Sequence, residues 1–239
     1  MEAITLPLRA LIDPVGAIPK AVSQRRWFIP LLLLALLTAL AGGVVASRID
    51  ASRVVLPKMQ MTGELMKASE REVSEAIQQA ERVALVAGIA KGLLLMPLLV
   101  LVLAVVLKIA AWLTGRKALF PDLFTVAALT MLPVTVFHAI EVLSALRLEL
   151  ITPAAAASLV PTSLSALVTD AGPKLSRVFT AIDVVNIWAA LMMGVGFAAA
   201  SKWSAWKGAL FGLFLYVLFA SAFMVGLPGL MPAPGAGGP

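Results

Sequence analysis

Residues 92–113 read GLLLMPLLVLVLAVVLKIAAWL and contain one charged residue, Lys108, in 22 positions. A helix of this length rises about 33 Å, which is enough to cross a hydrocarbon core of about 30 Å. The apolar run starts earlier, at Val83, and is too long for one crossing. Because Lys91 divides the run, we expect the span to begin at Gly92 and the preceding residues to stand outside the core.

The rest of the chain repeats this pattern. Of its 239 residues, 61% are hydrophobic and 13% are charged, about half the charge of a soluble domain. The composition therefore predicts an all-α, polytopic helical membrane protein with about five transmembrane helices within residues 27–227. A cytoplasmic lead precedes this membrane domain over 1–26, and a Pro/Gly-rich tail over 228–239 is expected to be disordered. The expected spans are 27–47, 92–113, 120–143, 179–200 and 205–227.

The basic residues indicate how the spans are oriented. The net charge is +6, but Lys and Arg gather beside the ends of apolar runs, where membrane topology requires them, so we reject nucleic acid as a partner. By this rule the N-terminus lies inside and the C-terminus outside. The segments expected on the inner side carry Arg9, Lys20, Arg25 and Arg26, then Lys108, Arg116 and Lys117, then Lys202 and Lys207.

Three segments are expected not to span the membrane. Residues 6–22 mix apolar and charged positions with three prolines, which favours short helices on the inner membrane surface or a partly ordered lead-in to the first span. Residues 144–178 are apolar but interrupted by Pro153 and Pro161, which favours a re-entrant or interfacial hairpin on the outer side.

Residues 58–91 predict a helical arm that continues outward from the second span. Glu and Lys or Arg are spaced for pairing along a helix. A weak coiled-coil stripe runs through Met66, Val73, Ile77 and Ala80. The stripe either packs on this protein's own outer loop or docks a protein partner.

The search for catalytic chemistry yields little. The chain has no Cys and one histidine, His138, with Glu141 three residues later on the same helical face. A zinc site needs more ligands than this pair supplies. We therefore expect no enzyme activity, no metal and no cofactor. The pair is interpreted as a structural hydrogen bond or as a proton- or ligand-responsive site.

A second polar group lies in the fourth expected span. Asp183 has Thr180 and Asn186 three residues to either side, so the three share one helical face. A carboxylate there is too costly to face lipid and should point into the bundle, as a packing clamp or as a substrate or ion site. Its expected partner is His138, with Lys91, Lys174 and Arg177 as alternatives.

Small residues predict close helix packing. Gly88 and Gly92 form one GxxxG pattern, and Gly208 and Gly212 form another. Such patterns let two helix backbones approach each other, although they do not by themselves imply a dimer.

Three stretches are similar to the Yip domain (Ypt/Rab-interacting protein) family of five-span membrane proteins. These stretches are LIDPVGAIPKAV with WFIPLLLL, then WLTGRKALFPDLFTVAALTMLPV, then IDVVNIWAALMMGVGFAAASKWSAWKGAL, in which Asp183, Ile187 and Trp188 carry the most specific motif. The resemblance implies a cytosolic N-terminus, five spans and a non-enzymatic role. Eukaryotic relatives are linked to vesicle trafficking and small-GTPase binding. They carry a long cytosolic N-terminal region that is not expected in this chain, so we do not transfer GTPase binding to it. Some bacterial relatives are accessory subunits beside ABC-type exporters.

The leading functional hypothesis is a non-catalytic scaffold or accessory protein of the bacterial cytoplasmic (inner) membrane. It would act through membrane lipids and through a protein partner or a homo-oligomer, with a transporter as one possible neighbour. The alternative is a small transporter, channel or lipid-handling protein that uses the polar site around Asp183. A membrane-embedded hydrolase ranks third, and no small-molecule substrate is indicated.

Overall fold

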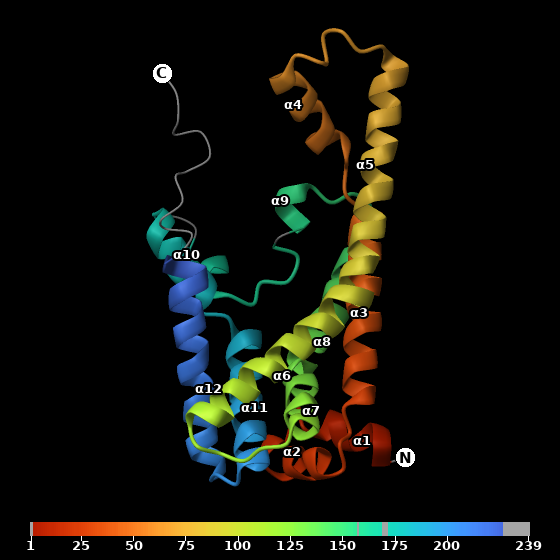
Figure 1. The fold of residues 1–239 in the computed structure, drawn as a ribbon. Coiled ribbons are helices and arrows are strands. Elements are labelled where there is room, and N and C mark those ends of the chain that lie inside the picture. Colours follow the sequence, from red (N-terminus) through yellow and green to blue (C-terminus); the bar gives the residue numbers. More distant parts are fainter. Residues whose placement is uncertain (1, 157, 169–171, 227–239) are drawn as a thin grey trace. The chain divides into compact units, whose positions relative to one another are not determined.

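The computed structural model describes residues 2–156, 158–168 and 172–226, and within them the chain is helical (Figure 1). Backbone pairing outside helices is limited there to two isolated bridges, Ile49 with Ile151 and Ser163 with Asp183. The expected all-α class is confirmed, and within the described residues five helices are long and apolar enough to cross a membrane. These are Phe28–Ala46, Glu70–Leu113, Phe120–Leu146, Val184–Ser201 and Ala205–Gly226. The expected disordered tail over 228–239 and the side chain of Lys174 lie outside the described residues.

The chain forms two compact units. Unit 1 comprises residues 1–30, 103–134 and 161–239, and unit 2 comprises 31–102 and 135–160. Three helices, α3 (Phe28–Ala46), α6 (Met96–Leu113) and α8 (Leu132–Leu146), have residues in both units. Unit 1 otherwise holds α1 (Glu2–Arg9), α2 (Pro14–Ser23), α7 (Phe120–Thr130), η2 (Leu164–Ala166), α10 (Pro173–Ala181), α11 (Val184–Ser201), α12 (Ala205–Phe219) and η3 (Ala220–Gly226). Unit 2 otherwise holds α4 (Ser52–Thr62), α5 (Glu70–Ala90), η1 (Lys91–Leu95) and α9 (Pro153–Ala156).

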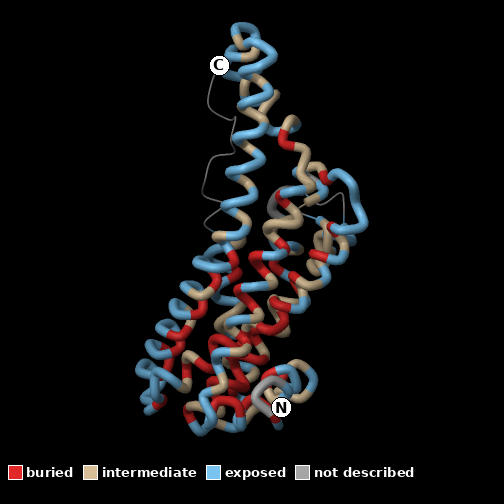
Figure 2. Tube along the Cα trace, turned by 90° about the vertical axis from the view of Figure 1, so that its right-hand side faces the viewer, coloured by how far each residue is buried: buried red, intermediate tan, exposed pale blue. Residues whose placement is uncertain are grey.

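Helix α11 is the centre of unit 1, and it packs against α12, α7 and α2. The largest fully buried side chains of this unit include Phe197 and Met192 on α11 and Leu123 on α7. Figure 2 colours the chain by burial, with buried residues in red. Helix α2 buries one face, which includes Ile18, against α7 and α11. The amphipathic lead is therefore packed onto the protein along this face.

Glycines bring α11 and α12 into backbone contact. A Cβ on Gly212 would lie 2.1 Å from the carbonyl oxygen of Ala190, and a Cβ on Gly208 would lie 2.2 Å from that of Gly194. No other residue fits at such a distance. The second GxxxG pattern is thus used for packing within the chain.

Unit 2 uses the first GxxxG pattern in the same way. A Cβ on Gly88 would lie 2.5 Å from the carbonyl oxygen of Gly42, and a Cβ on Gly92 would lie 2.1 Å from the backbone nitrogen of Ala39. Helix α3 therefore crosses the junction of α5 and η1 at backbone distance. The wider π turn of η1 ends at Leu95, two residues before Pro97, whose missing N–H cannot continue the α-helical hydrogen bonds.

The segment expected as one helix over 58–91 consists of two helices. Helix α4 ends at Gly63, which has a φ of +71° and so adopts the left-handed conformation typical of a helix C-cap. Helix α5 then begins with a capping box, in which Ser69 and Glu72 satisfy each other's backbone N–H groups. From Glu70 the helix runs unbroken to Leu113.

Two other expected spans also differ in their details. The third is divided at Met131, two residues before Pro133, because proline disturbs the preceding turn. The fourth begins at Val184 rather than near 179, because the chain leaves the helical conformation at Ile182 and Asp183.

Candidate functional site

Asp183 lies at a break between α10 and α11 rather than inside a helix. Its backbone is extended, with φ −121° and ψ 126°, and its side chain caps α11 by accepting a 2.9 Å hydrogen bond from the backbone N–H of Asn186. The residue is 8% exposed. A carboxylate at this position satisfies a free N–H group and lies at the positive end of the helix dipole.

The loop before α10 completes the hydrogen bonds of this break. The Thr162 hydroxyl donates to the Asp183 carboxylate. The backbone N–H of Val184 donates to the Thr162 carbonyl over 3.0 Å, and that of Leu164 donates to the Ile182 carbonyl over 2.9 Å. Interrupted backbone within an apolar bundle is tolerated only when its polar groups are paired, and here the loop pairs them.

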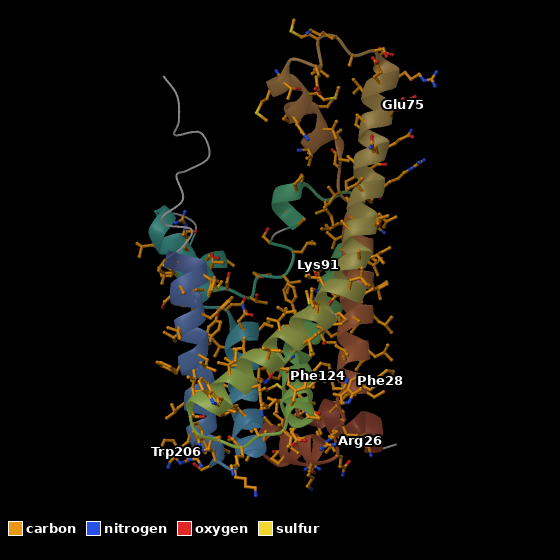
Figure 3. The ribbon with its side chains drawn as sticks, viewed as in Figure 1. Arg26, Phe28, Glu75, Lys91, Phe124 and Trp206 are labelled. Carbon is orange, nitrogen blue, oxygen red and sulfur yellow. The ribbon has the colours of Figure 1, made fainter. Side chains whose placement is uncertain are left out.

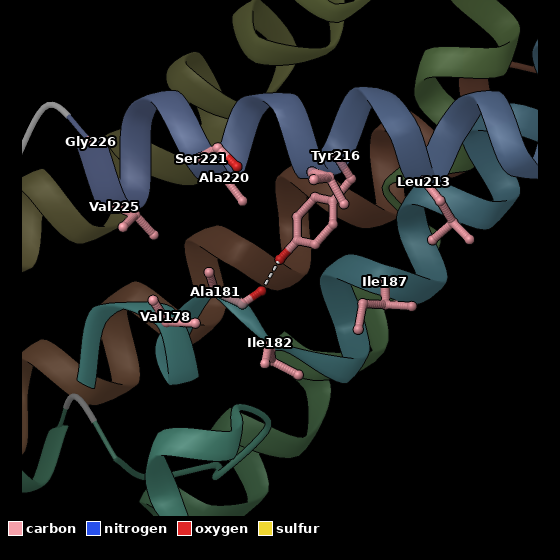
Figure 4. Close-up of a pocket in the computed structure, with 11 residues that line it drawn as sticks. Val178, Ala181, Ile182, Ile187, Leu213, Tyr216, Ala220, Ser221, Val225 and Gly226 are labelled. Atoms are coloured by element: carbon pink, nitrogen blue, oxygen red, sulfur yellow. Dashed lines mark hydrogen bonds between the residues drawn. The ribbon is translucent and has the colours of Figure 1, made fainter. Parts of the chain in front are cut away.

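Tyr216 of α12 forms a hydrogen bond with the backbone carbonyl at the end of α10. Its hydroxyl donates to the Ala181 carbonyl oxygen over 2.5 Å (Figure 4). We call Thr162, Ala181, Asp183, Asn186 and Tyr216 the Asp183 corner. Every member accepts or donates a hydrogen bond within the group, so the corner holds α10, α11 and α12 together in unit 1.

An apolar cavity of about 520 Å³ lies beside the corner. Ile187 and Leu213 line it together with Tyr216, and Asp183 is not among the lining residues. Figure 4 shows these side chains between α10, α11 and the α12–η3 helix. A cavity with this lining suits an acyl chain or another apolar group better than an ion or a polar substrate.

The polar residues singled out in the sequence are only partly brought together. Asn186 meets Asp183 through its backbone, but the Thr180 hydroxyl donates to the Ser176 carbonyl within α10. Among the described residues of unit 1, no salt bridge joins Asp183 to Arg177. Trp188, which directly follows Ile187 on α11, is half-buried.

His138 and Glu141 form a separate pair on α8. His138 Nδ1 lies 2.8 Å from Glu141 Oε2, and both side chains are largely buried. A ring edge of Phe137 packs against the imidazole. In the described part of the chain, no three His, Asp or Glu side chains gather as a metal-ligand group.

The expected docking stripe lies in unit 2, with one member displaced. Val73, Ile77 and Ala80 are half-buried on α5, whereas Met66 lies in the turn before that helix and is 95% exposed. Helix α4 packs against α5, the helix that carries the other three members. Helix α5 has no fully buried residue. Figure 3 labels Glu75 on α5 and Lys91 immediately after its end.

The comparisons with known proteins give one match. The profile of the Yip1 domain matches residues 8–227, which leaves out only the first seven and the last twelve residues. The chain belongs to the Yip1 domain family. The resemblance in its sequence is thereby confirmed at the level of the family. No curated protein and no solved structure matches this Yip1 domain chain.

The sequence does not point to Thr162 or Tyr216 as partners of this corner. Tyr216 lies in an unbroken apolar run, and Thr162 lies in a segment expected to fold as an outer hairpin. One signal was available for Asp183. An Asp directly before the apolar run VVNIWAAL is typical of a helix N-cap, and it indicates a helix start rather than an intrahelical carboxylate.

Proposed function

We propose that this chain is a non-catalytic scaffold or accessory protein of the bacterial inner membrane, which acts through protein or lipid contacts. A transporter is one candidate for its neighbour. The Yip1 domain membership and the five apolar helices support a membrane role. The observation that carries the proposal is the helix Glu70–Leu113, which is longer than any membrane crossing requires.

The length of this helix leaves an arm outside the membrane. At 1.5 Å per residue its 44 residues rise about 66 Å, while a hydrocarbon core is about 30 Å thick. The polar part is α5, which begins with the Ser69 capping box and carries an Arg71–Glu75 ion pair of 2.8 Å. A rigid helix that extends from a membrane span presents a fixed surface to a partner.

The half-buried stripe is the proposed contact on this arm. Val73 and Ile77 are half-buried apolar residues on α5, and α4 packs against the same helix. Two occupants compete for this stripe, the chain's own α4 and a protein partner. The proposal requires the partner to cover what α4 leaves open.

Single-cysteine labelling separates these occupants, because the chain has no native cysteine. An Ile77→Cys variant is compared with Gln78→Cys, which is exposed on the neighbouring face. A maleimide reagent is applied to native membranes and to the purified protein. The proposal predicts that Cys at 77 reacts much faster after purification, whereas Cys at 78 reacts equally in both. Equal rates at 77 in both preparations would remove the docking stripe from the proposal.

A lipid-handling role is the second candidate, and the cavity beside the Asp183 corner supports it. Its apolar lining suits an acyl chain. A transporter that moves ions or polar substrates through this corner has less support, because the Asp183 carboxylate already accepts hydrogen bonds from the Asn186 N–H and the Thr162 hydroxyl. An Ile187→Trp substitution, which fills the cavity, should reduce the lipid that co-purifies with the protein. Unchanged lipid recovery would count against lipid handling here.

A further inference from the structure

A second cavity of unit 1 has basic walls. It measures about 510 Å³ and lies where the α6–α7 loop meets the turn between α11 and α12. The α11–α12 turn has three residues, and the helices on both sides of the cavity are candidate spans that end there. The residues that line the cavity are Arg116, Lys202, Trp203, Ser204 and Lys207.

The backbone of the α6–α7 loop fixes Arg116 against an aromatic floor. Gly115 has a φ of +67°, and the N–H of Arg116 donates over 2.7 Å to the Ala111 carbonyl, which completes a Schellman cap on α6. The Arg116 guanidinium then lies 5.3 Å from the ring centroid of Trp203. Trp203 itself packs edge-on against the buried Phe197, so the floor is rigid.

The turn contributes the other cations. Lys202 has a φ of +58°, a left-handed conformation that usually selects glycine at the end of a helix. A lysine at this position keeps a charged side chain beside the cavity despite the backbone cost. Ser204 and Lys207 are the N-cap and third residues of α12, and the Ser204 side chain makes no capping hydrogen bond. The Ser204 hydroxyl also donates no hydrogen bond within the described residues, so it remains available as a donor.

No Asp or Glu is among the described residues that line the cavity. The salt bridges of the described residues include none from Arg116, Lys202 or Lys207. Trp206, next to Lys207 in the sequence, is 63% exposed (Figure 3). Its position indicates that the cavity lies near a membrane boundary. Exposed tryptophans at the ends of spans are typical of the headgroup region.

The geometry points to this cavity as a binding site for the phosphate of an anionic phospholipid headgroup. Arg116, Lys202 and Lys207 supply three cations that form no salt bridge within the described residues, and the Ser204 hydroxyl supplies a neutral donor. A phosphodiester matches these donors, while its acyl chains extend along the spans that end at the cavity. A lipid is favoured over free phosphate because the cavity lies at the ends of apolar helices. The inference deepens the lipid-contact part of the proposed function, on which it rests, and it does not involve the α5 arm.

Native mass spectrometry of the full chain tests the assignment. The protein is exposed in detergent to equal amounts of phosphatidylglycerol and phosphatidylcholine, and the retained lipid is counted. The wild type should retain phosphatidylglycerol preferentially. The Lys202→Gln/Lys207→Gln variant, which leaves the Arg116–Trp203 contact in place, should lose about tenfold in this retention. The matched control Lys58→Gln/Lys67→Gln removes the same charge from exposed positions in unit 2 and should retain the lipid as the wild type does.

Three results would overturn the assignment. The first is equal retention by the Lys202/Lys207 variant and the wild type, and the second is an equal loss in the control, which would indicate only bulk charge. The third is displacement of the lipid by inorganic phosphate but not by chloride at the same ionic strength, which would make free phosphate the ligand. If the double variant fails to fold, Lys202→Gly, which suits the left-handed backbone, should still lower retention severalfold. Partner recovery through the α5 arm is read separately, so the two proposals can fail independently.

Discussion

Replacing Asp183 by alanine should destabilise unit 1, whereas asparagine should be tolerated. Alanine removes the cap that accepts from the Asn186 N–H, at a cost of about 1 kcal/mol. It also leaves the Thr162 hydroxyl without its acceptor in a largely buried corner, at a cost of about 1–3 kcal/mol. The two effects together amount to about 3 kcal/mol, or about a hundredfold in the unfolding equilibrium constant. Asparagine caps helices as well as aspartate, and its amide can donate to Thr162, so the loss should stay below about 1 kcal/mol.

The assay is reversible unfolding of the purified protein in mixed micelles as the fraction of denaturing detergent rises. The five tryptophans, including Trp188 on α11, provide the fluorescence signal. An alanine variant as stable as the wild type would refute the corner as a structural unit. An asparagine variant as damaged as the alanine variant would show that the negative charge matters more than the cap, and would move Asp183 towards a substrate or ion site.

Three further predictions concern other parts of the chain. Gly212→Ala should cost about 1–3 kcal/mol in the same assay because its Cβ meets the backbone of α11, whereas Gly172→Ala, with no atom within 4 Å of its Cβ, should be neutral. The hydrogen bond from the Ser52 hydroxyl lowers the pKa of Asp50 below its ordinary value of 3.8. The ionised Asp50 carboxylate therefore stabilises the start of α4 above pH 3.8, and this stabilisation is lost as the pH falls through the lowered pKa. Hydrogen exchange in the first turn of α4, corrected for intrinsic rates, should show the loss, and Asp50→Asn should abolish its pH dependence. Ser69→Ala should lower the stability of the first turn of α5 by about 1 kcal/mol, because it removes the capping box. Hydrogen exchange of that turn would detect the loss, and Thr62→Ala, at the end of α4, is the neutral control.

The sequence predicts the helical class and the five apolar helices because an uninterrupted apolar run has few alternatives to a membrane span. It also predicts close packing at Gly88 and Gly212, since small residues at helical spacing permit backbone contact. The break at Gly63 could have been predicted. A glycine followed by the Ser69–Glu72 capping pattern indicates the end of one helix and the start of the next.

The corner at Asp183 depends on information that no local pattern contains. Its carboxylate is held by Thr162, 21 residues earlier, and the broken end of α10 is held by Tyr216, 35 residues after Ala181. Such partners come together only when α10, α11 and α12 pack. The same holds for the basic cavity, where Arg116 contacts Trp203 only because the α6–α7 loop lies beside the α11–α12 turn.

The most direct test of the scaffold proposal is quantitative pull-down of the tagged protein from native membranes extracted in polymer nanodiscs, with mass spectrometry of proteins and lipids. A stoichiometric partner is expected with the wild type and with Asp183→Asn. Deletion of residues 58–82 should remove this partner while the five apolar helices stay inserted. The scaffold proposal fails if recovery of the partner is undiminished after the deletion, or if the wild-type chain carries neither a stoichiometric protein nor an enriched lipid.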